Sequence, residues 1–315
     1  MPYALLQTTL CRLGGLLYAP FLTSIALFAF CSPAPAEVIF ETTSPYHHIL
    51  VVDWNGIRSL RFDDAQESRM SLIDPLKGHF EYTEYFHMPW LWNTQMVSVL
   101  MVGLGGGTTQ RLFEHYYTNV NVETVEIDPA VLQVARNYFH FKESAHQKVH
   151  LEDGRVFLRR STNRHDLIIM DAYVQGRYGS SIPPHLTTTE FFQLARDHLT
   201  TNGVLAYNII GNLKEFRPEI VGAMYRTINT VFPQVYVFPA HSSQNVVLVA
   251  TMSATRFDLR TLRYRAAQLV QSGRVALPTF RNRVEAFIDQ PPASARRSPV
   301  LTDDYAPVES LTTVR

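Results

Sequence analysis

The sequence predicts an α/β protein in which a small antiparallel β-domain precedes a Rossmann-like, mostly parallel sheet. Two patterns predict this fold. Residues 37–94 carry short alternating apolar and polar runs, which are typical of antiparallel strands. In residues 95–315, apolar strand-like runs alternate with helical periodicity, which predicts a parallel sheet covered by helices.

Each element of this fold has its own local signal. In the β-domain, alternating runs predict strands over residues 47–53 and 56–62, and the polar run 63–68 predicts a turn. Asp128 and Pro129 supply an N-cap and a first-turn proline for the helix that follows them. Further strands are expected over residues 97–102, 120–127, 167–170 and 203–210, an antiparallel hairpin over 234–238 and 245–251, and helices over 189–198, 218–231 and 256–272.

A glycine-rich turn follows the first strand of the larger domain and indicates a ligand pocket. The strand ends in Gly103, Gly105, Gly106 and Gly107, and a helical pattern comes next. Glycines at such a turn let a ligand approach the backbone closely. Glu126 ends the second strand, where a carboxylate can accept hydrogen bonds from ribose hydroxyls. This order of elements predicts a nucleoside pocket.

The spacing of the glycines narrows the choice of nucleoside. The dinucleotide motif places a third glycine where this chain has Thr108 to Gln110. The Gly-Lys-Ser/Thr ending of triphosphate-binding loops is missing from the sequence. An adenosine compound without pyrophosphate remains, and S-adenosylmethionine or a relative fits best. Asp153, Gly154 and Asp171 follow the next two strands, so the sheet is expected to bring them to the same edge.

Six segments carry a resemblance to a known family. They are SPYHHILV (44–51), EYTEYFHMPWL (81–91), VGLGGGT (102–108), VEIDPAVLQVAR (125–136), EDGRVFL (152–158) and DLIIMDAY (166–173). Together they resemble the spermidine synthase (polyamine aminopropyltransferase) family, of which this chain looks like a divergent member. The resemblance implies a class I S-adenosylmethionine-dependent transferase sheet. It also implies transfer of an aminopropyl group from decarboxylated S-adenosylmethionine to putrescine or a similar amine.

The resemblance and the residue chemistry together assign candidate roles. Asp171 is the catalytic candidate, because a carboxylate at a strand end can take a proton from an attacking amine. Asp153 with Gly154 also fits an ordinary turn, and the aromatic candidates also fit a core. The co-substrate is expected to bind at Gly103, Gly105, Gly106, Gly107, Glu126, Asp153 and Gly154, and the amine is expected to contact His48, Tyr82, Glu84, Tyr85 and Tyr173.

The chain departs from the family's pattern on the amine side. The family's glycine motif carries an aspartate that holds the aminopropyl ammonium, and Gly106 stands at that place. Val174 replaces the second acid of the family's Asp-x-x-Asp-Pro motif, in which Asp171 is the first. Thr83 replaces a histidine, and His48 stands for a glutamine. The nucleoside half of the site is therefore intact, whereas the amine half is depleted.

Loss of the acid at position 106 leaves two alternatives open. An aspartate there would attract an ammonium and repel a carboxylate. Gly106 removes the objection to ordinary S-adenosylmethionine, whose carboxylate could lie near the helix N-terminus at Gly107 and Thr108. A methyltransferase on the same fold is the first alternative to aminopropyl transfer. An exported, non-catalytic binding protein is the second.

Composition limits the class of protein, its partners and its compartment. The 315 residues are 46% hydrophobic and 18% charged with a formal net charge of zero, so a packed core is expected and nucleic acid is not an expected partner.

Residues 1–36 predict a signal peptide or membrane anchor, because Arg12 is their only charge and the apolar run 13–30 precedes an Ala-x-Ala site. The protein is therefore expected to be exported, periplasmic or secreted, or attached to the membrane by this segment. Both cysteines, Cys11 and Cys31, lie there, so no metal site is expected. A small-molecule amine is the expected partner, and a homodimer stays open.

Overall fold

A computed structural model describes residues 35–312 of the chain, except residues 64 and 177–178. The expected signal peptide or anchor falls almost wholly outside the described residues and stays a prediction. Within the described part of the chain, no helix is both long enough and apolar enough to cross a membrane.

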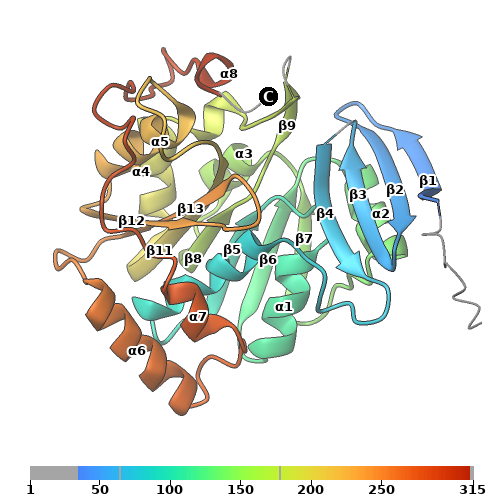
Figure 1. The fold of residues 1–315 in the computed structure, drawn as a ribbon, viewed down its shortest axis with the longest axis horizontal. Helices are drawn as coiled ribbons and strands as arrows, with labels where there is room; N and C mark the ends of the chain where they lie inside the picture. The colour runs from blue at the N-terminus through green and yellow to red at the C-terminus, as the bar shows by residue number, and fades with distance from the viewer. Residues whose placement is uncertain (1–34, 64, 177–178, 313–315) are drawn as a thin grey trace, which may run out of the picture. The chain divides into compact units, whose positions relative to one another are not determined.

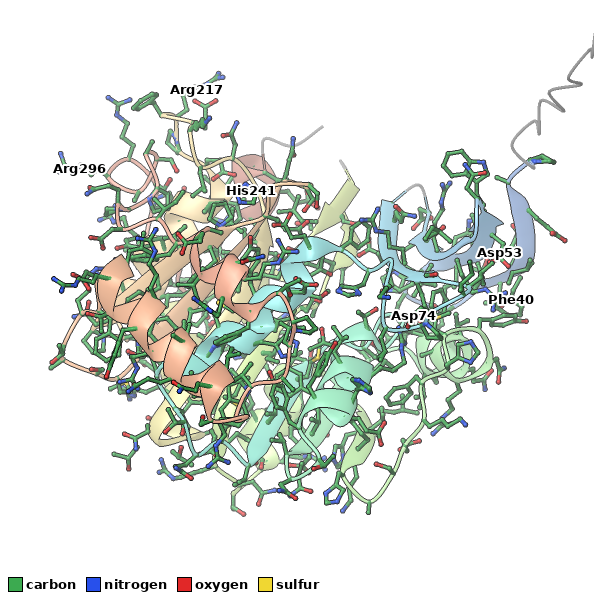
Figure 2. All side chains as sticks on the ribbon, turned by 60° about the horizontal axis from the view of Figure 1, so that its bottom comes forward. Phe40, Asp53, Asp74, Arg217, His241 and Arg296 are labelled. Carbon is green, nitrogen blue, oxygen red and sulfur yellow. The ribbon has the colours of Figure 1, made fainter. Side chains whose placement is uncertain are left out.

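Four antiparallel strands open the described chain, as the alternating runs predicted. They lie in the order β1 (Glu37–Thr43), β2 (His48–Trp54), β3 (Ile57–Phe62) and β4 (Ala65–Ser71) (Figure 1). One face of this sheet packs apolar side chains of β2 and β3 against helix α2 (Pro129–Tyr138). Phe40, labelled in Figure 2, packs against Tyr138 with ring centroids 5.0 Å apart. The small sheet is thereby attached to the larger domain through α2.

Strand β4 begins inside the polar run 63–68 that predicted a turn, so the prediction holds at Asp63 and is wrong from Ala65 onward. Residues 65–71 lack the alternation of apolar and polar residues that marks a half-buried strand, and Met70 is their only fully buried apolar side chain. Backbone pairing with β3 forms the strand nevertheless. Glu67, Ser68 and Arg69 line the cleft described below, which is why the sequence pattern did not indicate a strand.

The larger sheet is mostly parallel and confirms the predicted fold class. The strand order is β12-β13-β11-β8-β5-β6-β7, in which β13 runs antiparallel to both of its neighbours. The hairpin predicted over residues 234–251 is therefore confirmed. The strands are β5 (Ser98–Val102), β6 (Asn121–Glu126), β7 (Gln147–Leu151), β8 (His165–Met170), β11 (Leu199–Ile210), β12 (Gln234–Pro239) and β13 (Asn245–Thr251).

Helices cover both faces of this sheet because its central strands are apolar on both sides. In β5, Val99 and Met101 join one core, whereas Leu100 and Val102 join the other. The first core is closed by η1 (Glu81–Leu91, a 3-10 helix), α1 (Thr108–Tyr116), α6 (Leu259–Gln271) and α7 (Phe280–Val284) (Figure 1). The second is closed by α3 (Gly154–Arg160), α4 (Thr189–Asp197), α5 (Ile220–Asn229) and α8 (Val308–Leu311).

Two local features place the candidate site. The Asp128 carboxylate caps α2 by accepting a hydrogen bond from the Ala130 backbone N–H at 2.8 Å, and Pro129 follows it, as predicted. Strand β5 has β6 on one side and β8 on the other. The chain therefore adds β6 and β7 in one direction from β5, and then returns to add β8 in the other direction. Ligands of open α/β sheets bind at such a switch point, outside the carboxyl ends of the strands. A short hairpin, β9 (Val174–Gly176) and β10 (Gly179–Ser181), and the turn η2 (Pro184–Leu186) follow β8.

The domain boundary proposed at residue 94 stays a prediction. Helix η1 precedes that boundary, yet it packs against β11, β13, α6 and α7 of the larger domain. Tyr85 and Phe86 of η1 are fully buried in the core that covers one face of the large sheet.

Candidate active site

A cleft lies at the carboxyl ends of β5, β6 and β8, beside strand β4 of the small sheet. The cleft is open to solvent, and its lining combines the glycine turn with the acids at the strand ends. The structure brings together most of the predicted site residues here. Those that line the cleft are Gly103, Gly105, Glu126, Asp153, Gly154, Asp171, Tyr82 and Tyr173.

Gly103 allows the ends of β5 and β8 to meet at the base of the cleft. Its φ of 101° is one that L side chains rarely adopt. A Cβ atom at this position would lie 2.2 Å from the carbonyl oxygen of Asp171, which is far inside van der Waals contact. Glycine is therefore required for backbone geometry here, and that geometry sets the glycine turn against Asp171.

Glu126 is oriented toward the glycine turn by backbone donors. The Leu104 N–H donates to Glu126 Oε2 and the Asp128 N–H donates to Glu126 Oε1, both at 2.9 Å. Burial raises the pKa of Glu126 to about 7 against the opposing effect of these hydrogen bonds. Each carboxylate oxygen has two acceptor positions, so capacity for ribose hydroxyls remains.

Asp153 combines the two roles that the sequence left open. Its Oδ1 caps α3 by accepting hydrogen bonds from the backbone N–H groups of Arg155 and Val156 at 2.9 Å. Its Oδ2 accepts a hydrogen bond of 2.8 Å from His185 Nε2. The hydrogen bond from His185 is the main cause that lowers the pKa of Asp153. Asp153 is thus a helix cap whose second oxygen and histidine partner both lie in the cleft wall.

Asp171 is held by two side-chain donors from different elements. Tyr82 Oη of η1 donates to Asp171 Oδ2 at 3.1 Å, and Asn208 Nδ2 of β11 donates to Oδ1 at 2.9 Å. Asn208 is oriented in turn by Asn245 Nδ2, which donates to its Oδ1 at 3.1 Å. Burial raises the pKa of Asp171 to about 7, so this carboxylate can take up a proton near neutral pH.

Two tyrosines form the wall around Asp171. Burial raises the pKa of both Tyr82 and Tyr173 well above the ordinary value, so both stay protonated and act as donors. Tyr173 Oη donates to the backbone carbonyl of Asn208 at 3.1 Å, which leaves its ring to line the cleft. Tyr82 is the one whose hydroxyl touches the catalytic candidate.

Five predicted site residues lie outside the cleft lining, and one of them, Gly106, is described further below. His48 pairs with Glu41 at 2.8 Å on the small sheet, and its neighbour His47 lines the cleft instead. Adjacent residues of a strand point to opposite faces of the sheet, so the prediction of His48 was one residue away from the histidine that lines the cleft. Gly107 lies against Phe141. The other two, Glu84 and Tyr85, belong to a separate polar network.

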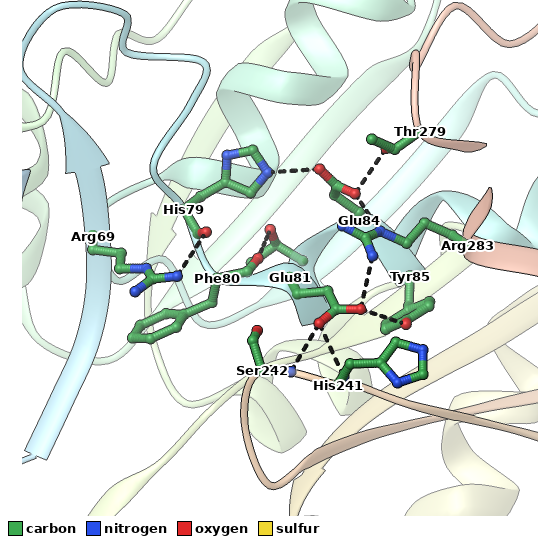
Figure 3. A network of polar contacts seen from close by, with 11 residues as sticks. Arg69, His79, Phe80, Glu81, Glu84, Tyr85, His241, Ser242, Thr279 and Arg283 are labelled. Atoms are coloured by element: carbon green, nitrogen blue, oxygen red, sulfur yellow. Dashed lines mark hydrogen bonds and ion pairs between the residues drawn. The ribbon is translucent and has the colours of Figure 1, made fainter. Parts of the chain in front are cut away.

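That network fixes η1 to neighbouring elements (Figure 3). Glu84 accepts hydrogen bonds from Thr279 Oγ1 at 2.7 Å, from Arg283 Nε at 2.5 Å and from His79 Nε2 at 3.1 Å. These partners lower the pKa of Glu84 to about 2 although burial opposes the shift. Tyr85 Oη donates to Glu81 Oε1 at 2.9 Å.

Glu81 completes the attachment of η1. Its Oε2 accepts hydrogen bonds from the backbone N–H groups of His241 and Ser242, in the turn between β12 and β13, at 2.9 and 3.0 Å. Arg283 Nη1 of α7 donates to Oε1 at 2.7 Å. The network therefore positions η1, and with it Tyr82, rather than contacting a ligand in the cleft.

Sequence reasoning missed several residues that line or order the cleft. His185 lies in a short turn and Asn208 lies inside a long apolar strand, where neither is marked by spacing. Glu67 and Ser68 were assigned to a turn, yet both line the cleft from β4. Ser68 Oγ accepts a hydrogen bond of 2.9 Å from the Gly106 N–H, so Gly106 contacts the small sheet and does not line the cleft itself. In the described ranges, no three His, Cys, Asp or Glu side chains are gathered closely enough to hold a metal ion.

Comparison with known proteins places this site in a family. The spermine/spermidine synthase domain matches residues 79–255 of the chain. A polyamine aminopropyltransferase of Vibrio vulnificus is 29% identical over 309 residues, which cover 94% of this chain and 97% of that protein. An eEF1A lysine and N-terminal methyltransferase of Xenopus laevis is 32% identical over 165 residues, which cover 50% of this chain and 23% of that protein.

The fold agrees with a solved structure of the same family. A crystal structure of spermidine synthase in complex with the transition state analogue AdoDATO matches with a TM-score of 0.58 and 20% identity, covering 79% of this chain and 87% of that one. At this identity the match establishes the fold alone. The domain match covers more than half of the sequence and includes η1, the glycine turn, Glu126, Asp153 and Asp171. The chain therefore belongs to the spermine/spermidine synthase family.

Proposed function

We propose that this protein is a spermidine synthase-like transferase that passes an aminopropyl group from decarboxylated S-adenosylmethionine to putrescine or a similar amine. The observation that carries this proposal is the setting of Asp171, a buried carboxyl held by Tyr82 and Asn208 in the same cleft as Glu126 and Asp153. The full-length similarity to a protein named polyamine aminopropyltransferase supports the choice of reaction.

The cleft residues fit an adenosine co-substrate. Glu126 offers its remaining acceptor positions to the ribose hydroxyls at the end of β6. Asp153 and Gly154 also line the cleft, where they would meet the adenine. The by-product 5′-methylthioadenosine presents the same groups, so we expect it to bind as well.

The reaction needs one base and an in-line approach. The amine nitrogen attacks the aminopropyl carbon that is bonded to the sulfonium, so a carbon–nitrogen bond forms while the carbon–sulfur bond breaks. The bond electrons move to sulfur, which becomes a neutral thioether. The nitrogen loses a proton to Asp171, whose pKa of about 7 suits a base at neutral pH. Tyr82 and Asn208 keep its two oxygens oriented during this transfer.

Methyl transfer is the second candidate function, and Gly106 is the observation that favours it. The family's ammonium-binding acid is missing at that position, which removes one repulsive contact for the carboxylate of ordinary S-adenosylmethionine. The relative in Xenopus laevis is named a methyltransferase, which gives this candidate independent support.

The N-terminal segment bears on the third candidate, an exported binding protein without catalysis. We propose that residues 1–36 direct export or attach the protein to a membrane, since they carry one charge and a long apolar run. S-adenosylmethionine is a cytoplasmic metabolite, so export would separate the protein from its co-substrate. Fractionation of cells that carry a C-terminally tagged protein tests this location, and a soluble cytoplasmic chain of full length would contradict it.

One assay separates the three candidates. The full chain is incubated with decarboxylated or ordinary S-adenosylmethionine, putrescine and a panel of amines, and products are identified by mass spectrometry. An aminopropylated amine with release of 5′-methylthioadenosine is the expected result. Methylated products alone would transfer the assignment to methyl transfer. No product together with no calorimetric heat for 5′-methylthioadenosine or either sulfonium compound would leave the non-catalytic candidate.

A further inference from the structure

Strand β4 carries a bulge where it borders the cleft. Ser68 lies opposite Leu60 and Gln66 lies opposite Arg61, so Glu67 is the extra residue between these pairs. In a regular strand, neighbouring side chains point to opposite faces, whereas a bulge re-aims one of them. Here Glu67 and Ser68 both line the cleft, as does Arg69, whose guanidinium lies 4.6 Å from the centroid of the Phe80 ring. The bulge thus brings a carboxyl group to the amine side of the site.

Contact with the glycine turn places this carboxyl next to the position where the family's acid is missing. Ser68 Oγ accepts the hydrogen bond from the Gly106 N–H. A Cβ atom at Gly106 would lie 3.0 Å from both Ser68 Cβ and Phe139 Cδ1, so an aspartate there would need its neighbours to move. Strand β4 therefore occupies the space of the missing acid and supplies Glu67 from the adjacent position.

Glu67 and Asp171 line the same cleft, and no ion pair to either acid is found within the described part of the chain. Ser180 Oγ of β10 donates to Glu67 Oε1 at 2.6 Å, and burial raises the pKa of this carboxyl. Glu67 lines the same cleft as Asp171, Tyr82 and Tyr173, and its charge raises the pKa of each of these three groups. A cationic ligand would satisfy both acids.

We propose that Glu67 holds the primary ammonium of the aminopropyl arm and thereby selects decarboxylated over ordinary S-adenosylmethionine. This assignment rests on the proposed function of the cleft. The decarboxylated compound presents only the ammonium at the end of its arm, whereas the ordinary one adds a carboxylate that Glu67 repels. Glu67, which lies on β4, thus supplies the negative charge that is missing at Gly106.

Binding measurements test the assignment without requiring turnover. Calorimetry on the full chain compares 5′-methylthioadenosine, decarboxylated S-adenosylmethionine and ordinary S-adenosylmethionine for the wild type, Glu67→Gln and Glu285→Gln. Glu285 is an exposed glutamate paired with Arg263, so its variant controls for loss of one negative charge. For Glu67→Gln we expect the Kd of the decarboxylated compound to rise roughly tenfold to a hundredfold, because a charged hydrogen bond is lost. The Kd of 5′-methylthioadenosine, which has no ammonium, should stay the same.

Each result decides one question. Unchanged affinity of Glu67→Gln for the decarboxylated compound would overturn the role of Glu67, and so would an equal loss for 5′-methylthioadenosine, which would indicate a structural role. Ser180→Ala keeps the charge and removes the hydrogen bond, so it should retain most of the preference for the decarboxylated compound. A protein that forms only methylated product yet shows the expected change in Glu67→Gln would refute the proposed reaction while leaving the ammonium site in place.

Discussion

The two halves of the cleft are built in different ways. The proposed nucleoside half comes from residues at consecutive strand ends: Glu126 ends β6, and Gly103 and Asp153 follow β5 and β7 of the same sheet. The amine half comes from segments that are distant in sequence, because Tyr82 lies on η1, Asn208 on β11 and Glu67 on β4. Backbone hydrogen bonds orient the first half, whereas side chains from other elements orient the second.

This difference indicates which half can change without loss of the fold. The nucleoside half depends on backbone geometry that a substitution would distort. The proposed amine half depends on side chains whose charge can be moved from one element to another, as we propose for Gly106 and Glu67. We therefore expect substitutions in the two halves to separate binding of the nucleoside from transfer to the amine.

Asp171→Asn should have the largest effect on transfer. The variant keeps the size of the side chain but cannot accept the proton, so we expect a loss of roughly 100-fold to 10,000-fold in rate. Calorimetry should show that 5′-methylthioadenosine still binds, because the nucleoside half is unaltered. A variant with the wild-type rate of product formation would refute the role of Asp171. It would also contradict the expected separation of nucleoside binding from transfer to the amine.

Gly103→Ala should have the next largest effect, and it should act on the nucleoside half and on folding. A Cβ atom 2.2 Å from the Asp171 carbonyl oxygen forces the backbone apart, so we expect unfolding in denaturant to become easier by about 3 kcal/mol. Gly56→Ala is the matched control, because its φ of 74° is also left-handed but nothing lies near the added atom. It should lower the free energy of unfolding by about 1 kcal/mol. Equal losses in the two variants would mean that crowding at Gly103 does not matter.

Glu84→Gln should destabilise the protein without changing ligand binding. Loss of the charge weakens the hydrogen bonds from Arg283 and His79 in a partly buried network, so we expect a decrease of about 2 kcal/mol in the free energy of unfolding. The pKa of Glu84 is about 2 in the folded protein, below its ordinary value of 4.5. Its stabilising effect is therefore present above pH 4.5 and lost as the pH falls toward 2.

Two measurements check this expectation. Unfolding curves at neutral and acidic pH should show that the gap between wild type and Glu84→Gln closes on acidification. The KM for the amine should be the same in both proteins, because Glu84 lies outside the cleft lining. A raised KM with unchanged stability would restore the predicted role of Glu84 in substrate binding.

The smallest expected effect is a shift in the midpoint of the pH–rate profile, which would report the interaction between Glu67 and Asp171. Transfer requires ionised Asp171, so the rate should rise with pH through about 7. In Glu67→Gln the negative neighbour is gone, so the Asp171 pKa should fall and the midpoint should move to lower pH, by less than about one unit. Tyr82, Tyr173 and Asn208, which also face Asp171, stay neutral over this range. Titration of the amine substrate is common to both proteins, so an identical midpoint in both would argue against coupling of the two acids.

The sequence alone determined the succession of strands and helices along the chain and the residues of the proposed nucleoside half of the cleft. Apolar runs that end in Gly103, Glu126 and Asp171 specify strands whose carboxyl ends meet at one edge, because parallel strands connected by helices all point the same way. The N-cap at Asp128 was also predictable from the sequence, because it depends only on residues adjacent in the chain.

The sequence indicated Asp171, Tyr82 and Tyr173, whereas only the tertiary structure decided the rest of the amine half. The bulge at Glu67 depends on pairing between β3 and β4, and it reverses the face that simple alternation would assign. Asn208 meets Asp171 only because β11 lies beside β8 in the sheet. Glu84 and His48 were assigned to the site because short-range spacing does not tell which face of an element a neighbouring segment covers. Local pattern encodes local structure, whereas contacts between distant segments depend on packing that no short stretch of sequence contains.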